Sequence, residues 1–558
     1  MAVDKVLLKI SCDNWLVVFG ILVALLLRNV TMLHPYSGQG KPPMYGDYEA
    51  QRHWMEITTN LPVSEWYRNT SDNNLEYWGL DYPPLTAYHM YFCGLIANFL
   101  NENYTVLHAS RGFESDEHKI FMRLTVLLCD ILVYIPSLVI FYYSCAKLYQ
   151  SDSANRSVKQ NYTIPSSLSI ILALLYPGII LIDHGHFQYN NVSLGLTTFS
   201  VIFLLHQKNI LSSIFFCLAL NYKQMELYHS LPFFLYLLST CIPKPGKRAI
   251  SGVVSLFVLG ITVVVTFSII WLPFLFDLDI LLQVLHRQFP FARGIFEDKV
   301  ANFWCALNVV YKLKVCDKAK LMRICLFTTL SAVFPSSVDL FLRPNRKKFI
   351  LALINSSLAF FLFSYQVHEK TILVVALPVL LYFPENPFVC FWFLFISVFS
   401  MVPLFVKDDL IVAVIALLMF YIISFYVSMK YYYQSRCNSS NVSNYHIEQI
   451  RFLHNLINVD VKKSDKISRV FKMITRSRKT VEYFIFFLAM LLSFVGSLLI
   501  FVISIVFEPP VKYPDLFPLL ISIYSCFHFL GFFVYFNVKQ IQISQDFGDI
   551  GNVKLKEN

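Results

Sequence analysis

The sequence predicts an all-α polytopic membrane protein with about 14 transmembrane helices. Of its 558 residues, 56% are hydrophobic and 15% are charged, so too few charged side chains are present to cover a soluble protein of this length. The mean hydropathy is also positive, at +0.54. The hydrophobic residues form runs separated by polar segments, and in lipid each run must satisfy its own backbone hydrogen bonds as a helix. This composition excludes soluble enzymes, secreted disulfide scaffolds and disordered chains.

The first apolar run, near 14–33, has no evident small-residue cleavage site behind it, which indicates a retained signal-anchor. Arg28 lies near the far end of this run, and we expect it to reach the interface of a thin bilayer such as that of the endoplasmic reticulum. The runs expected to cross lie near 14–33, 121–146, 166–183, 192–206, 209–221, 227–243, 251–275, 321–341, 348–366, 371–383, 386–404, 409–428, 482–506 and 514–537.

Lysine and arginine residues set the orientation of these runs. Four loops are strongly basic and are therefore expected in the cytosol: 147–159, 244–248, 343–348 and 429–480. The four share one side only if the short run 85–100, which follows Pro83 and Pro84, does not cross. We interpret it as a re-entrant or interfacial helix.

This orientation predicts two large lumenal loops, 34–120 and 276–320, and places both termini in the cytosol. The net charge of +10 is explained by these cytosolic loops, so no nucleic-acid partner is expected. None of the 12 cysteines forms a C-x-x-C pair, and zinc motifs have no support. Cys305 and Cys316 share the second lumenal loop and could pair in an oxidising compartment.

Five polar clusters with residue types that chemistry uses all fall on the predicted lumenal side. Ionisable groups at the ends of apolar helices are functional candidates, so the clusters indicate a single lumenal site. They are GDYEAQRHW at 46–54, LDYPP at 80–84, DHGHFQYN at 183–190, RGIFEDK at 293–299 and QVHEK at 366–370.

Each cluster also has a structural alternative. Asp47 could cap a helix that begins near Tyr48, and Asp81 could occupy a turn before the two prolines. His184 and His186 could be interfacial or metal ligands, but no third ligand is obvious and no metal site is predicted. In the cluster at 293–299, Arg293 and Lys299 could anchor the next helix at the lipid headgroups. In the cluster at 366–370, residues 368–370 could form a structural salt bridge.

The motifs at 46–54, 77–87 (YWGLDYPPLTA), 183–190 and 291–304 (FARGIFEDKVANFW) resemble those of the dolichyl-phosphate-glucose-dependent glucosyltransferases of the endoplasmic reticulum. The resemblance runs from about 44 to 370. Within that family, the motifs at 46–53 and 184–186 favour members that add the first glucose to lipid-linked Man9GlcNAc2 over members that add the second.

The resemblance implies a GT-C glycosyltransferase architecture. A conserved seven-helix module would occupy 1–275 and include loop 34–120, with the second lumenal loop at 276–320. A variable transmembrane module would occupy 321–558 and include the cytosolic loop 429–480. It implies an endoplasmic reticulum membrane location with a lumenal site. The C-terminal sequence KLKEN resembles a di-lysine retrieval signal.

The resemblance further implies an inverting alpha-1,3 transfer of glucose in the N-glycosylation pathway. Dolichyl phosphate glucose would be the donor, dolichyl-pyrophosphate-linked Man9GlcNAc2 the acceptor, and no cofactor is expected. One carboxylate must take the proton of the attacking hydroxyl, and Asp47 matches the family's loop aspartate.

Other residues are expected to bind the two substrates. The candidates for the donor phosphate are Arg293 and His368 first, then Lys299 and Lys370. The candidates for sugar hydroxyls are Asp81, His184, His186, Gln188 and Tyr189. Glu297 and Glu369 would orient the basic groups, and Arg52 and His53 are further candidates in the first motif.

Two alternatives remain at this stage. The chain could be the second-glucose paralogue or another GT-C transferase. A transporter fits less well, since transporters place their polar groups near the membrane midplane.

Overall fold

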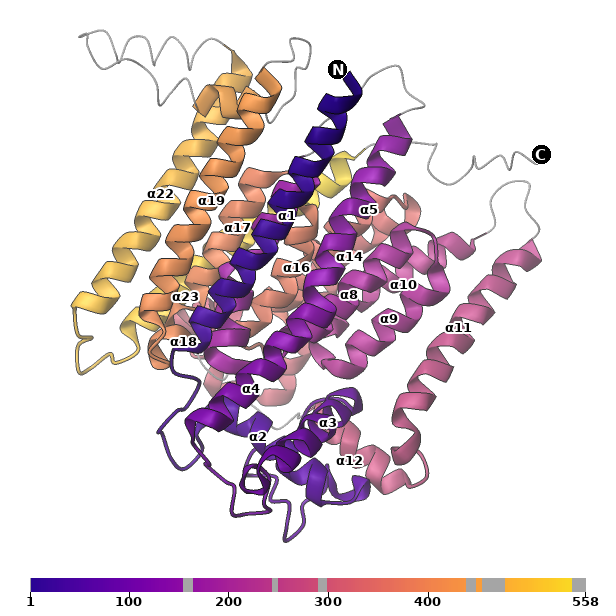
Figure 1. Cartoon of the computed structure of the whole chain (residues 1–558), viewed down its shortest axis with the longest axis vertical. Coiled ribbons are helices and arrows are strands. Elements are labelled where there is room, and N and C mark those ends of the chain that lie inside the picture. Colours follow the sequence, from indigo (N-terminus) through magenta and orange to yellow (C-terminus); the bar gives the residue numbers. More distant parts are fainter. Residues whose placement is uncertain are drawn as a thin grey trace.

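The computed structural model describes residues 2–153, 164–242, 249–289, 299–437, 448–453 and 477–543. In these segments the regular elements are helices, as the composition predicts. Figure 1 shows a bundle of long, roughly aligned helices with a layer of shorter helices against one end. The candidate site lies where this layer meets the bundle.

The first part of the bundle contains two short stretches of π-helix, each continuous with an α-helix. One stretch continues α4, and the other follows α6 and α7 and carries the DHGHF motif. The elements are α1 (Ala2–Met32), α4 (Asp116–Cys129), η3 (Asp130–Tyr134), α5 (Ile135–Ser153), α6 (Ser166–Leu174), α7 (Pro177–Ile179), η4 (Ile180–Phe187), α8 (Asn190–Leu205), α9 (Asn209–Tyr222), η5 (Gln224–Glu226), α10 (Leu227–Cys241), α11 (Ala249–Trp271) and η6 (Leu272–Phe274).

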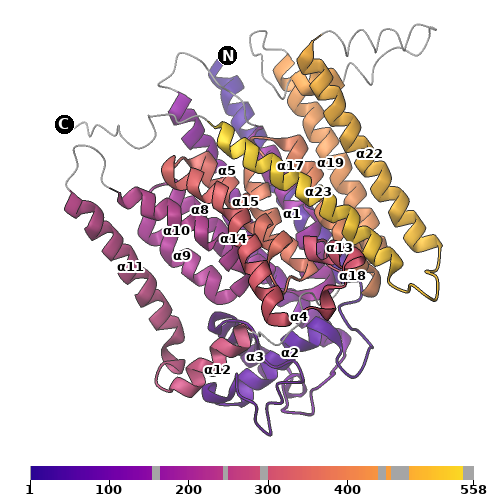
Figure 2. The same cartoon turned by 180° about the vertical axis from the view of Figure 1, so that it is seen from behind.

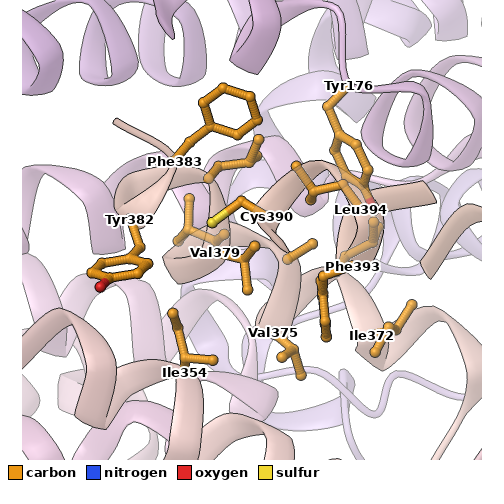
Figure 3. Close-up of a cluster of buried hydrophobic side chains, with 14 of the residues drawn as sticks. Tyr176, Ile354, Ile372, Val375, Val379, Tyr382, Phe383, Cys390, Phe393 and Leu394 are labelled. Carbon is orange, nitrogen blue, oxygen red and sulfur yellow. The ribbon is translucent and has the colours of Figure 1, made fainter. Parts of the chain in front are cut away.

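The second part of the bundle surrounds a densely packed apolar centre. Figure 3 shows Ile354 of α15, Val375 and Val379 of α16, and Phe393 and Leu394 of α17 gathered at this centre. The elements are α14 (Lys318–Leu342), α15 (Arg346–Phe363), η8 (Glu369–Thr371), α16 (Ile372–Tyr382), α17 (Pro387–Ser400), α18 (Val402–Lys407), α19 (Ile411–Cys437), α22 (Arg478–Val506) and α23 (Leu516–Gln542).

Within the described segments, eight helices are long and apolar enough to cross a membrane. They cover Asn14–Met32, Asp116–Ser144, Ser166–Phe187, Ile250–Phe274, Lys318–Leu342, Ile411–Ser435, Arg478–Val506 and Leu516–Gln542. Three shorter apolar helices accompany them: Asn190–Leu205, Asn209–Tyr222 and Pro387–Ser400. The chain is therefore an all-α, multi-span membrane protein. α1 begins and α23 ends at the same end of the bundle (Figure 2).

The layer at the opposite end contains α2 (Gly46–Asn60), η1 (Val63–Glu65), α3 (Pro84–Leu100), η2 (Glu102–Tyr104) and α12 (Leu278–Gln288). The last elements of the second predicted lumenal loop are α13 (Phe303–Val310) and η7 (Leu313–Val315).

The segment 85–100 forms α3, which begins at Pro84, where the missing backbone N–H is not needed. α3 packs against α2 and is not among the candidate spans. Trp54, Met55 and Met90 belong to a separate buried core that α2 and α3 share.

Arg28 contradicts the expectation that it reaches the membrane interface. Its side chain is fully buried, and its Nε donates to Asp130 Oδ2 at 2.5 Å. Its Nη1 donates to the carbonyls of Ala24 and Leu174. A charge inside an apolar bundle is tolerated when it is paired and hydrogen-bonded, and Asp130 provides that pair.

Cys305 and Cys316 are both free thiols, so the disulfide considered from the sequence does not form. Cys305 is a buried residue of α13, whereas Cys316 is only partly buried. Parts of the basic loops, the residues Arg293 and Glu297, and the di-lysine tail lie outside the described residues.

Candidate active site

A cavity of about 1310 Å³ lies between the layer of short helices and the bundle. Its polar side chains come from four distant segments of the chain: Asp47 from α2, His186 and Gln188 from the end of η4, Lys370 from η8, and Asp408 after α18. Four of the five polar clusters singled out from the sequence therefore contribute to one cavity, with Asp81 representing the LDYPP motif.

Asp47 reaches this cavity because two glycines let the chain cross itself closely. Gly38 and Gly46 have φ angles of 76° and 74°, which favour glycine. A Cβ on Gly38 would lie 2.0 Å from the backbone carbonyl of Tyr45, and one on Gly46 would lie 2.7 Å from that of Ser37. The crossing brings Ser37 Oγ to 3.4 Å from the Asp47 backbone N–H.

The same crossing is tied to the histidine motif, since the Ser37 backbone N–H donates to the His186 carbonyl at 3.0 Å. Asp47 lies in the first turn of α2, where the partial positive charge of the helix end favours a carboxylate. It is not the cap of this helix: Tyr45 occupies the N-cap position, and no side-chain cap hydrogen bond forms there.

The two carboxylate oxygens of Asp47 have different surroundings. Oδ2 accepts from Gln188 Nε2 at 2.5 Å, lies 3.0 Å from His186 Nε2, and pairs with the Lys370 ammonium group. Within the described part of the chain, no hydrogen bond to Oδ1 is found. The Asp47 side chain lines the cavity and retains 22% of its surface exposed, so the carboxylate is accessible from the cavity.

Opposing effects set the charge of this carboxylate. Burial alone would raise the pKa of Asp47, but the charges of Lys370 and His186 and their hydrogen bonds hold it well below its usual value. Burial would likewise lower the pKa of Lys370, but Asp47 raises it above the ordinary value. The pair is therefore ionised near neutral pH.

His186 is held between two carboxylates. Its Nδ1 lies 2.5 Å from Asp408 Oδ2, and its Nε2 faces Asp47 Oδ2 and lies 3.1 Å from Lys370 Nζ. The Asp408 side chain is only 3% exposed.

Other side chains complete the polar wall. Asp81, His368 and Glu369 line the cavity, and Tyr82 OH lies 3.5 Å from Gln188 Oε1. Lys223 follows α9, pairs with Asn190 Oδ1 and lies over the Tyr82 ring. Burial lowers the pKa of Lys223 to about 8.

From this polar wall the cavity continues between apolar side chains of three helices. They are Leu227 at the start of α10, Met322, Leu326 and Leu330 on α14, and Phe360 on α15. The space therefore has a charged end and an apolar arm, as an amphipathic ligand requires.

Several residues predicted to bind substrate lie away from this cavity. Arg52 is fully buried in an ion-pair network with Glu49 and Glu56, at 2.6 and 2.7 Å, and His53 also contacts Glu56. His184 is buried and lies 2.5 Å from Asp130 Oδ2.

Two further candidates are engaged by other partners. The Tyr189 hydroxyl contacts Thr125 Oγ1 at 2.6 Å inside the fold. Lys299 pairs with Asp515, at the start of α23, at 2.9 Å.

Asp408, Lys223 and Arg287 also line the cavity, but none of them belongs to the five polar clusters predicted from the sequence. Two signals were available: KDD at 407–409 and KQME at 223–226 are short charged breaks between apolar runs on the predicted lumenal side. Among the residues described, no group of three or more His, Cys, Asp or Glu side chains is arranged to hold a metal ion.

Residues 15–536 match the model of the ALG6, ALG8 glycosyltransferase family. The chain is 44% identical to the dolichyl pyrophosphate Man9GlcNAc2 alpha-1,3-glucosyltransferase of Gallus gallus, over 94% of this chain and 97% of that protein. It is 44% identical to the probable enzyme of that name from Drosophila melanogaster, over 93% and 97%. It is 39% identical to the one from Arabidopsis thaliana, over 94% and 90%. On the strength of a match along nearly its whole length, the chain belongs to the ALG6, ALG8 glycosyltransferase family.

Proposed function

We propose that this protein transfers the first glucose from dolichyl phosphate glucose to dolichyl-pyrophosphate-linked Man9GlcNAc2 in alpha-1,3 linkage. The observation that carries the proposal is Asp47, a carboxylate held through one oxygen at the head of an amphipathic cavity. Identity of 44% to the Gallus gallus alpha-1,3-glucosyltransferase over nearly both chains supports the choice of substrate.

The proposed reaction is a single inverting displacement. The acceptor hydroxyl oxygen attacks the anomeric carbon of glucose, and the bond from that carbon to the phosphate oxygen breaks. The electron pair leaves with dolichyl phosphate. Asp47 Oδ1 accepts the hydroxyl proton as the new bond forms, because Oδ2 is already occupied by donors.

The leaving phosphate departs as an anion and needs positive charge around it rather than a proton. Lys370 and His368 lie on the cavity wall, with Lys370 paired to Asp47, and Lys223 and Arg287 add charge on other parts of it. Arg293 and Glu297, also proposed from the motif, lie outside the described residues. The apolar arm along α14 supports a lipid-linked donor, since an isoprenoid chain requires such a surface.

For the whole chain we propose the GT-C architecture with about 14 crossings, of which the eight long helices are the clearest members. The remaining crossings would be shorter helices packed inside the bundle. We place the protein in the endoplasmic reticulum membrane, with the Asp47 cavity facing the lumen and both termini in the cytosol.

The test is a glucosyl-transfer assay with the purified full-length protein and a synthetic dolichyl phosphate glucose analogue. Two acceptors are compared, Man9GlcNAc2 and its singly glucosylated form, each with and without a chelator. We expect one hexose to be added to Man9GlcNAc2 in alpha-1,3 linkage, with no loss of activity in the chelator. Transfer only to the glucosylated acceptor would instead assign the second-glucose reaction.

Asp47→Asn provides the matched variant, because it keeps the shape of the side chain and removes the base. Turnover should fall by about 1,000-fold or more while the thermal unfolding midpoint stays close to that of the wild type. Near-normal turnover in this variant would remove Asp47 from the role of base.

A further inference from the structure

The carboxylate of Asp408 is a polar group of the cavity wall that the reaction just described does not use. It follows α18 in a tight turn, in which the Asp408 backbone N–H donates to the Leu404 carbonyl at 3.2 Å. Its side chain is 3% exposed and reaches His186 Nδ1 at 2.5 Å. A buried carboxylate requires a donor, and the ring of His186 supplies one.

This contact determines which ring nitrogen of His186 faces each carboxylate. An ionised carboxylate accepts hydrogen bonds but cannot donate them, so Nδ1 must be the donor toward Asp408. Nε2 is thereby directed at Asp47 Oδ2, 3.0 Å away, and at Lys370 Nζ, 3.1 Å away. Asp408 thus fixes the orientation of the ring that contacts the proposed base.

The packing around the turn keeps this geometry in place. A Cβ on Gly185, beside His186, would lie 2.9 Å from Leu410 Cδ1, so the turn and η4 are in close contact. Leu410 itself is fully buried. On the other side, Lys41 Nζ donates to the Lys407 carbonyl at 2.8 Å, which ties the turn to the segment before α2.

We propose that Asp408 is a positioning residue for glucosyl transfer, which acts through His186 to hold Asp47 in its reactive orientation. Asp408 supplies no proton to substrate and accepts none from it. It aligns the imidazole, and the imidazole with Lys370 and Gln188 fixes Oδ2, so that Oδ1 remains directed at the acceptor. The inference rests on the proposed function, because the step that it supports is the proton transfer to Asp47.

The test compares Asp408→Asn with Asp409→Asn in the purified full-length enzyme. Asp408→Asn keeps the shape and an acceptor oxygen but removes the charge. Asp409 is adjacent, exposed and at a φ angle of 58°, which asparagine tolerates, so it is the matched control. We expect kcat to fall by about 10- to 100-fold in Asp408→Asn, with KM for the donor within about threefold and Asp409→Asn close to the wild type.

A double-mutant cycle separates positioning from general support of the fold. If Asp408 acts through His186, adding Asp408→Asn to a His186→Gln enzyme should reduce kcat by less than about twofold. A multiplied loss in the double variant, or a wild-type kcat in Asp408→Asn, would overturn the proposal. If Asp408→Asn does not fold, Asp408→Glu keeps the charge and should still lower kcat, because it displaces the carboxylate by one methylene.

A structural readout keeps this inference apart from the proposed function. In a cryo-EM map of Asp408→Ala, we expect the His186 ring to leave its contact with Asp47, whatever substrate the enzyme uses. A ring that stays in place would refute the positioning role. Absence of glucosyl transfer by the wild-type protein would instead refute the proposed function.

Discussion

At the scale of single residues, the asymmetry of Asp47 is the feature from which the chemistry follows. Three donors converge on Oδ2, and the partners of this carboxylate keep its pKa well below the usual value. A carboxylate that is already ionised can take up a proton without first losing one.

Lys370→Met should shift the acidic limb of the pH–rate profile to higher pH. Burial raises the pKa of Asp47, and Lys370 is the largest of the opposing effects. Without that charge the pKa rises, so Asp47 is protonated and inactive at a pH where the wild type still works. Transfer rates measured across the acidic range with saturating donor test this. An unmoved limb would show that Lys370 does not control the charge of Asp47.

Sequence motifs identify residues that face the cavity but not the side chains that hold those residues in position. Asp47, His186, Gln188 and Lys370 were candidates from the sequence and lie together. His184, only two positions from His186, points instead to Asp130. In a motif with this spacing, local sequence cannot tell which histidine faces the cavity, because the π-helical turn of η4 sets the direction.

At the scale of elements, α2 has two faces with different tasks. One face presents Asp47 to the cavity, and the other buries Arg52 between Glu49 and Glu56. Although burial would raise the pKa of Glu56, its hydrogen bond with His53 and the charge of Arg52 lower it to about 2. The ion pairs of this network therefore stabilise the layer throughout the neutral range.

Arg52→Met should destabilise the layer without altering the affinity for the donor. Removing the cation leaves two buried carboxylates uncompensated, a loss of about 3–5 kcal/mol. The thermal unfolding midpoint should fall, while KM for the donor in the folded fraction stays unchanged. Arg68→Met, at an exposed position in the same layer, is the control and should have little effect on either quantity. A raised KM with normal stability would restore a substrate-binding role to Arg52.

Gly38→Ala should damage both stability and activity more than Gly40→Ala. Both glycines have positive φ angles, but a Cβ on Gly38 would meet the Tyr45 carbonyl, whereas one on Gly40 meets nothing within 4 Å. The two variants share a strain of about 1 kcal/mol, and Gly38→Ala adds a backbone clash that displaces Asp47. Thermal unfolding and transfer rates measure the difference. Equal effects would mean that the crossing tolerates movement.

Element boundaries are predictable where apolar runs meet polar ones. Whether a given run crosses the membrane is harder to predict, as α3 shows. Its 17 residues are apolar enough to suggest a span, and the charge bias of distant loops was needed to keep it out of the count. The π-helical segments η3 and η4 had no signal in the sequence, because their residues fit an α-helical pattern equally well.

At the scale of the whole molecule, helices that are apolar on every side pack inside the bundle. α16 is only 11 residues long and is buried throughout, so hydropathy alone does not say whether it crosses. Arg28 illustrates the same limit. Its charge suggested a position at the interface, whereas its partner Asp130 lies 102 residues away in the sequence.

Protease protection in sealed microsomes tests the proposed topology. α1 begins and α23 ends opposite the layer that contains α2 and α3, and the basic loops are expected in the cytosol (Figures 1 and 2). Epitope tags at either end should therefore be digested by added protease. Asn69, exposed in the sequon NTS, should carry an endoglycosidase-sensitive glycan that Asn69→Gln removes. Protected tags would contradict this topology.

Asp47, His186, Lys370 and Asp408 meet at the cavity although they come from distant segments of the chain. Asp47 and its hydrogen-bond partner Lys370, for example, are 323 residues apart. During synthesis these segments emerge from the ribosome in sequence, and the last of them appears after roughly 400 residues have been translated. Until then, a nascent chain holds Asp47 without the complete set of groups that orient it. Premature termination upstream of α18 should therefore yield an inert fragment rather than a weakly active or misdirected transferase.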